Sequence, residues 1–168
     1  YCLKGPERLV SRSQKDMLRR LFEIEVPVVY NGVVEIKSIS REAGQRSKVA
    51  VHSEQEGIEA VGSCIGIRGN RIQSIVNELQ GEKIDVVSWD PDPKTFIARS
   101  ISPSEVLHVE WDTGEQTAVV VVLDKQLSLA IGKEGQNARL AARLAGWRLD
   151  IKGLIEWEEI QEVMLAAR

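Results

Sequence analysis

Cysteine is scarce in this chain, and long apolar runs are missing. Only Cys2 and Cys64 occur among the 168 residues, and they lack CxxC spacing. Reduced thiols in a cytosolic protein are the simplest interpretation. No apolar run approaches the ~20 residues that a membrane-spanning helix needs. The first six residues lack the apolar core of roughly 7–15 residues that a signal peptide carries. We therefore expect a cytoplasmic protein with no membrane segment.

The chain also lacks the residue patterns of common enzymes. His52 and His108 are isolated, and neither an HxxxH pattern nor a local Ser-His-acid set occurs. Neither of the two glycine pairs described below is followed by the Gly-Lys-Ser/Thr of a Walker A loop. We accordingly predict a protein that is not an enzyme and holds no cofactor and no metal ion.

Aromatic residues make up only 5% of the chain. Trp89 and Trp147 fall in predicted strands and are expected in the core, whereas Trp111 is expected at a sheet edge. The chain therefore lacks the aromatic stacking platform of an RNA recognition motif.

Excess positive charge is absent as well. A net charge of −3 argues against nucleic-acid binding. The average hides an asymmetry, because residues 124–152 contain six Lys and Arg against three acids. Residues 153–168 then contain four Glu against one Arg. A basic segment followed by an acidic end is thus predicted in the last third of the chain.

One short pattern occurs twice: Ile-Gly-x-x-Gly followed by a helix-like stretch. The first copy contains Gly66 and Gly69, and the second contains Gly132 and Gly135. Paired glycines allow a ligand to approach backbone amides closely. A helix that begins directly afterwards directs free N–H groups and its positive dipole end at the same place. The pattern therefore suits phosphates and matches the GxxG loop of KH modules, which clamps about four nucleotides.

The context of the two copies repeats as well. A capping box with Ser13 as N-cap and Asp16 predicts the first helix, which Val26-Pro27 ends. The remaining expected elements are strands 33–39 and 47–52, helices 60–65 and 70–79, strand 84–89, linker 90–93, helix 94–101, strands 106–111 and 117–123, helices 126–131 and 136–145, strand 147–151 and a C-terminal helix 154–168. The order α-β-β-α-α-β thus occurs twice. It predicts an α+β fold of two modules, each a three-stranded sheet covered by helices.

This order is that of the type II (bacterial) KH fold. Four segments of the sequence indicate a particular family within that fold. Residues 21–27 (LFEIEVP), 35–42 (EIKSISRE), 81–86 (GEKIDV) and 127–141 (LSLAIGKEGQNARLA) closely resemble the tandem KH region of the NusA family of bacterial transcription factors. The resemblance covers about residues 1–153. It implies the last strand of a truncated OB-type barrel at 1–12, a first KH module at 13–90 and a second at 91–153, followed by the C-terminal helix 154–168.

The resemblance also implies a function. It indicates a monomeric cytoplasmic factor that binds single-stranded nascent RNA and modulates RNA polymerase pausing, termination and antitermination. RNA polymerase and other transcription or antitermination factors are the implied partners. The alternative is a protein-interaction scaffold whose KH folds dock RNA polymerase or ribosomal proteins, which Glu134, the acidic end and the net charge favour.

The expected groove in each module lies between the glycine loop, its flanking helices and the second strand. Gly66, Gly69, Gly132 and Gly135 allow close backbone approach, and Arg68, Arg71 and Lys133 supply positive charge near phosphates. Gln136 and Asn137 offer hydrogen bonds to a ribose or a base. Asn70 and Arg139 lie on the helices that follow the loops, while Ile65, Ile67 and Ile131 offer apolar contact. Arg41 and Arg46 are expected to close the first groove.

Some of these residues have a purely structural alternative. The isoleucines are equally well explained as core residues. Arg71, Arg139 and Arg143 are also explained as solvated helix charges. Glu134 reduces attraction to phosphate, so we expect the second loop to contact RNA less evenly or to pair this acid with a cation or a base donor.

Overall fold

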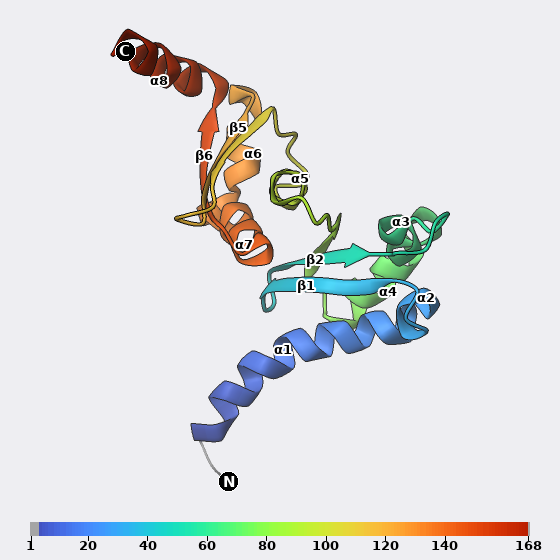
Figure 1. Cartoon of the computed structure of the whole chain (residues 1–168). Coiled ribbons are helices and arrows are strands. Elements are labelled where there is room, and N and C mark those ends of the chain that lie inside the picture. The colour runs from blue at the N-terminus through green and yellow to red at the C-terminus, as the bar shows by residue number, and fades with distance from the viewer. Residues whose placement is uncertain (1–3, 168) are drawn as a thin grey trace. The chain divides into compact units, whose positions relative to one another are not determined.

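The two copies of the motif lie in separate units of the chain. The computed structural model describes residues 4–167, with side chains from residue 15 onward, and divides the chain between Trp89 and Asp90. Each unit contains one three-stranded sheet with helices packed against it (Figure 1). No helix within residues 4–167 is long and apolar enough to cross a membrane.

The first unit builds its sheet around a central strand, β2. Its elements are α1 (Lys4–Glu25), α2 (Pro27–Tyr30), β1 (Glu35–Glu42), β2 (Arg46–His52), α3 (Ala60–Ile65), the 3-10 turn η1 (Ile67–Gly69), α4 (Asn70–Glu78) and β3 (Lys83–Ser88). β2 pairs antiparallel with β1 and parallel with β3. The parallel pairing requires a crossover, and α3, η1 and α4 form it. The first glycine loop is therefore part of the connection that closes the sheet.

The apolar core of the first unit lies between its sheet and the helices α1 and α4. Val49 and Val51 of β2 are completely buried with Leu18 and Phe22 of α1 and Ile75 of α4. Residues of this size each contribute about 1.5–3 kcal/mol on burial. The apolar positions of α1 and α4 thus hold the two helices against the strands that flank the loop.

The N-terminal part of the chain differs from the prediction. Residues 4–12 are the first turns of α1, so the predicted barrel strand at 1–12 is wrong for them; residues 1–3 lie outside the described part. Ser13 lies inside the helix and does not cap it. Pro6 is compatible with a helix start, because the amides of the first turn need no partner within the helix.

The predicted end of this first helix is confirmed. α1 ends at Glu25, where Val26 adopts extended backbone angles (φ −117°, ψ 102°) before Pro27. A residue before proline is disfavoured in the helical region, which explains the break. The short helix α2 that follows was not predicted.

The second unit repeats the arrangement around β5. Its elements are α5 (Pro93–Ser100), β4 (His108–Asp112), β5 (Thr117–Val122), η2 (Asp124–Gln126), α6 (Leu127–Ile131), η3 (Lys133–Gly135), α7 (Gln136–Ala145), β6 (Arg148–Gly153) and α8 (Leu154–Ala166). β5 pairs antiparallel with β4 and parallel with β6. The predicted order α-β-β-α-α-β is confirmed in both units, apart from α2 and the 3-10 turns.

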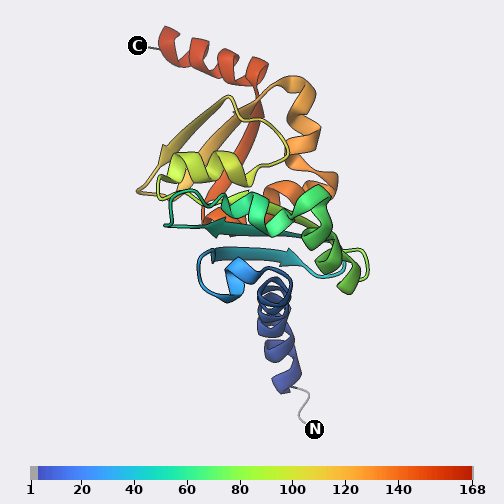
Figure 2. The ribbon, with the colours of Figure 1, turned by 90° about the vertical axis from the view of Figure 1, so that its right-hand side faces the viewer.

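The last helix, α8, is not covered by the rest of its unit. Figures 1 and 2 show it leaving the end of β6 and projecting outward. None of its described residues is buried, and Ile155, Val163 and Met164 are each more than half exposed. The predicted C-terminal helix is therefore present, but none of its residues belongs to the described core.

Candidate nucleic-acid interface

The two glycine loops have the same backbone conformation although their side chains differ. Gly66 and Gly132 have φ/ψ of 80°/178° and 81°/168°. Arg68 and Glu134 follow with 54°/27° and 57°/26°, and the second glycines, Gly69 and Gly135, have φ of 74° and 75°. The same loop is thus built twice.

The first glycine of each pair is constrained more strongly than the second. A Cβ atom on Gly66 would lie 2.2 Å from Asn70 Oδ1, and one on Gly132 would lie 2.7 Å from the backbone nitrogen of Asn137. At Gly69 the nearest atom would be 3.8 Å away. Both glycines therefore hold a positive φ that L side chains disfavour, and the first is needed for space as well.

The residues between the glycines hold a costly conformation. Arg68 and Glu134 are non-glycine residues at positive φ. A left-handed backbone costs such residues roughly 1–2 kcal/mol. Such conformations persist only where the surroundings enforce them, and they cluster at functional sites. Their presence at the same place in both loops supports a binding role for the loops.

A helix begins directly after each loop. α4 starts at Asn70 and α7 at Gln136, and no side chain caps either helix. The amides of these first two residues bond to the carbonyl oxygens of Ile67 and Lys133, so only the amides that follow them need a partner from outside the helix. Unsatisfied N–H groups and the positive end of the helix dipole attract anions. Each loop can therefore accept a phosphate through its backbone.

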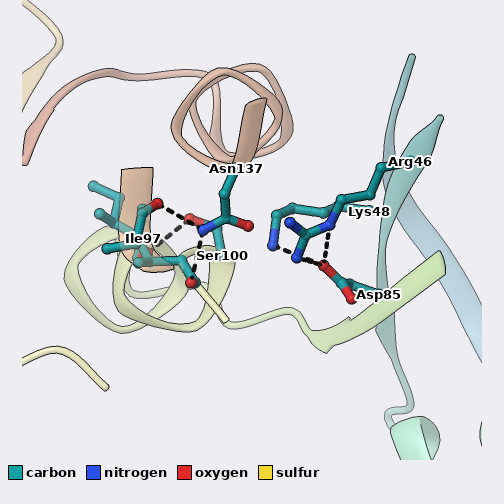
Figure 3. Close-up of polar contacts among 8 residues, drawn as sticks. Arg46, Lys48, Asp85, Ile97, Ser100 and Asn137 are labelled. Carbon is teal, nitrogen blue, oxygen red and sulfur yellow. Dashed lines mark hydrogen bonds and ion pairs between the residues drawn. The ribbon is translucent and has the colours of Figure 1, made fainter. Parts of the chain in front are cut away.

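A side chain from the second residue of each helix ties it to the helix before the loop. Arg71 Nη1 donates to the carbonyl oxygen of Ser63 at 2.8 Å. Asn137 Nδ2 donates to the carbonyl oxygens of Ala130 at 2.7 Å and Ile101 at 3.1 Å (Figure 3). Asn137 is fully buried, so the prediction that it contacts RNA is wrong. Arg71 and Asn137 both lie two residues after the second glycine of their loop. This shared position is the one sequence feature that could have indicated their common structural role.

Other candidate residues remain accessible. Ile67 is 82% exposed, and Arg68, Asn70, Lys133 and Glu134 are exposed too. The flanking side chains are half-buried: Ile65, Ile131 and Gln136. A hollow of about 510 Å³ lies beside the first loop, lined by α3, the loop, the start of α4 and the preceding Gly57 and Glu59. No sequence motif marks Glu59, whose carboxylate accepts from the Gly62 amide at the start of α3.

Arg41 does not lie free beside the groove as predicted. Its Nε and Nη2 atoms each lie 2.9 Å from a carboxylate oxygen of Glu82, and its side chain is 5% exposed. Glu82 also accepts from Ser47 Oγ and the Gly44 amide. Burial alone would raise the pKa of Glu82, but hydrogen bonds from Arg41, Ser47 and Gly44 lower it overall. Arg41 therefore serves the internal structure of the first unit.

Arg46 is also bound to an acid of the first unit, so the prediction that it closes the first groove is wrong. Its guanidinium pairs with Asp85, which Lys48 Nζ contacts at 3.2 Å (Figure 3). Arg46 is 9% exposed and Lys48 is completely buried. Burial lowers the pKa of Lys48 to about 8. These cations balance an acid of the protein, and they are not presented to a ligand.

Arg139 braces the second loop. Its Nη1 atom donates to the main-chain oxygen of Glu134 at 3.0 Å. Gln73, in the matching place of the first unit, bonds instead to Asn77 within its own helix. Arg139 thus stabilises the backbone of the second loop, a role that the sequence did not indicate.

Trp89, Trp111 and Trp147 all lie outside the two glycine loops. Trp89 and Trp147 are half-buried, and Trp147 packs against the core of the second unit. Trp111 is 40% exposed and makes an edge contact with Trp147 at a ring distance of 5.9 Å. Within residues 4–167, no group of three or more His, Cys, Asp and Glu side chains could hold a metal ion.

Comparison with known proteins agrees with this arrangement. Residues 12–89 match the model of the NusA-like first KH domain, and residues 93–159 match that of the NusA-like second KH domain. The crystal structure of APE1850 shares the fold with a TM-score of 0.57 at 24% identity, over 81% of this chain and 96% of that one.

Curated relatives carry the name transcription termination/antitermination protein NusA. The relative from Bacillus subtilis is 55% identical over 94% of this chain and 42% of its own length. Those from Halalkalibacterium halodurans and Mycobacterium tuberculosis are 54% and 53% identical, over 94% and 89% of this chain and 41% and 44% of their own lengths. The chain spans about two fifths of the length of these relatives. With both KH domains matched in order, the chain belongs to the NusA family of bacterial transcription termination/antitermination proteins.

Proposed function

We propose that the two glycine loops bind the phosphate backbone of single-stranded RNA. The observation that carries this proposal is the duplicated loop: one strained backbone, built twice, in front of two helices without side-chain caps. A KH groove takes splayed, unpaired bases, because a paired helix hides them. The proposed contacts come from Gly66, Ile67, Arg68, Gly69 and Asn70, and from Gly132, Lys133, Glu134, Gly135 and Gln136.

The two loops offer different chemistry around the same backbone. In the first loop Arg68 supplies a charge for a phosphate, and Ile67 supplies an exposed apolar surface for a base. In the second loop Lys133 supplies the charge, and Gln136 supplies hydrogen bonds. Arg71, Asn137 and Arg139 act as positioning residues, because their side chains bond to carbonyl groups of the loops or of the flanking helices.

We further propose that this RNA binding serves the modulation of pausing, termination and antitermination by RNA polymerase. This proposal rests on the names of the relatives, of which the chain spans about two fifths. It implies a monomeric, cytoplasmic, non-enzymatic protein whose partners are nascent RNA, RNA polymerase and other antitermination factors.

Titration with a fluorescent single-stranded RNA of about ten nucleotides tests the binding function. The affinity should exceed that for a matched hairpin stem, and log K should fall with log salt concentration by about 0.7 for each phosphate contacted. Equal or tighter binding of the stem would contradict the KH-groove mechanism. No RNA binding by the folded protein would favour the scaffold function instead.

A further inference from the structure

Glu134 occupies the same place in the second loop that Arg68 occupies in the first. Their backbone angles agree within a few degrees (φ 57° and 54°, ψ 26° and 27°), and the glycines on either side agree as well. The bond from Cα to Cβ therefore leaves both loops in the same direction. Both side chains are exposed. One loop thus presents a cation, and the other an anion, at an equivalent point of its backbone.

A carboxylate at this point is unfavourable if it meets a phosphate. Repulsion between two such charges would weaken binding severalfold. The backbone of the second loop is nevertheless stabilised around this residue, since Arg139 Nη1 donates to its main-chain oxygen and Asn137 clamps the next helix. The loop therefore fixes the backbone from which this acceptor-only side chain extends, next to Lys133.

The partner of such a group must supply hydrogen-bond donors. A carboxylate has two acceptor oxygens and no donor. Adenine and cytosine place a ring acceptor next to their exocyclic amine, and uracil flanks its single N–H with two carbonyls. Only guanine presents two adjacent donors, N1–H and N2–H, on its Watson–Crick edge. KH-bound bases are unpaired, so this edge is available.

We infer that Glu134 recognises a guanine base in the RNA strand held by the second loop. This inference rests on the RNA binding proposed above and deepens it. Arg68 contributes affinity that does not depend on sequence, whereas Glu134 contributes selectivity. The second loop therefore specifies one position of the bound sequence.

Selection from a random ten-nucleotide single-stranded RNA library tests the inference, with the protein and its Glu134→Gln and Arg68→Gln variants compared. The parent should enrich guanine at one position, about tenfold over the other bases. Replacing that guanosine by inosine, which lacks N2, should reduce affinity several-fold. Glu134→Gln should lose both effects, because its amide offers only one acceptor. Arg68→Gln should bind all RNAs more weakly and keep the guanine preference.

The outcomes separate the two proposals. Failure of every RNA to bind would contradict the proposed function itself. Intact RNA binding without guanine enrichment, or enrichment that survives Glu134→Gln, would overturn the role of Glu134 alone. A guanine preference that disappears with EDTA would also overturn this role, because it would indicate a magnesium ion bridging Glu134 to phosphate. Loss of affinity on 2′-deoxy substitution with no loss on inosine substitution would assign Glu134 to a ribose hydroxyl and overturn base recognition.

Discussion

Aspartate at Gly69 and Gly135 should remove most RNA affinity while both units stay folded. Each substitution places a carboxylate where a phosphate is proposed to approach. The space is sufficient, because a Cβ atom at either position would have no neighbour closer than 3.8 Å. The cost to the fold is that of positive φ, about 1–2 kcal/mol for a general residue, and Asp tolerates this region better than most.

The expected loss of binding follows from the charge. Two unit charges about 5 Å apart repel by roughly 1 kcal/mol in water and about 3 kcal/mol near a protein surface. Each substitution should therefore weaken binding by about 5- to 150-fold. The effect should be smaller at Gly135, because the Arg139 guanidinium lies 3.8 Å from the new Cβ position and offsets part of the added charge.

Fluorescence anisotropy with a ten-nucleotide single-stranded RNA at ~0.15 M salt measures the loss, and thermal melting verifies the fold. Gly146→Asp is the matched control. Gly146 also has positive φ (76°) and open space around it, but it caps the far end of α7. It should melt like the other variants and bind RNA like the parent. A folded Gly69→Asp/Gly135→Asp double variant that binds as tightly as the parent would refute the loop mechanism.

Three further perturbations give separate expectations. Arg68→Ala should lower the slope of log K against log salt by about one, and Lys133→Ala should act in the same direction; unchanged slopes would mean that neither meets a phosphate. Asn137→Ala should cost about 1–3 kcal/mol of unfolding free energy, because two buried carbonyl groups lose their donor; an unchanged melt would contradict the clamp. Folded Lys48 loses its proton near pH 8, whereas the unfolded residue keeps it to about 10.5, so the unfolded state binds more protons between these values. This residue's contribution to the unfolding free energy should therefore rise with pH across that window. Urea unfolding of the parent and of Lys48→Met at pH 8 and pH 10 measures it, and equal changes in both proteins would contradict the assignment.

The sequence predicted the elements around the loops well, because their signals are local. The glycine pairs, the apolar periodicity of α4 and α7 and the break at Val26-Pro27 each depend on neighbouring residues. The roles of Arg41 and Asn137 depend on distant partners instead. Glu82 lies 41 positions from Arg41, and the carbonyl group of Ile101 lies 36 positions from Asn137. A polar residue near a predicted groove cannot be separated from a buried structural one until those partners are known.

The error at the N-terminus has a different physical origin. Ser13 is a cap signal by intrinsic preference, but serine is only mildly unfavourable inside a helix. Pro6 lies in the first turn of α1, where proline is tolerated. Helix α1 continues through them to residues that pack on the sheet, namely Leu18 and Phe22. Local preference is a weak guide where tertiary packing further along the same helix decides the outcome.

The parallel pairing of β2 with β3, and of β5 with β6, has a consequence for how the loops become ordered. The last strand of each sheet is joined to the central strand through two helices and the glycine loop between them, which cross over the sheet. Closing that connection costs chain entropy during folding, before any ligand arrives. Each glycine loop is thereby held at both ends by helices of the folded unit. RNA bound as proposed would meet a loop that folding has already ordered, so more of the free energy of each phosphate contact would go into affinity instead of into ordering the protein.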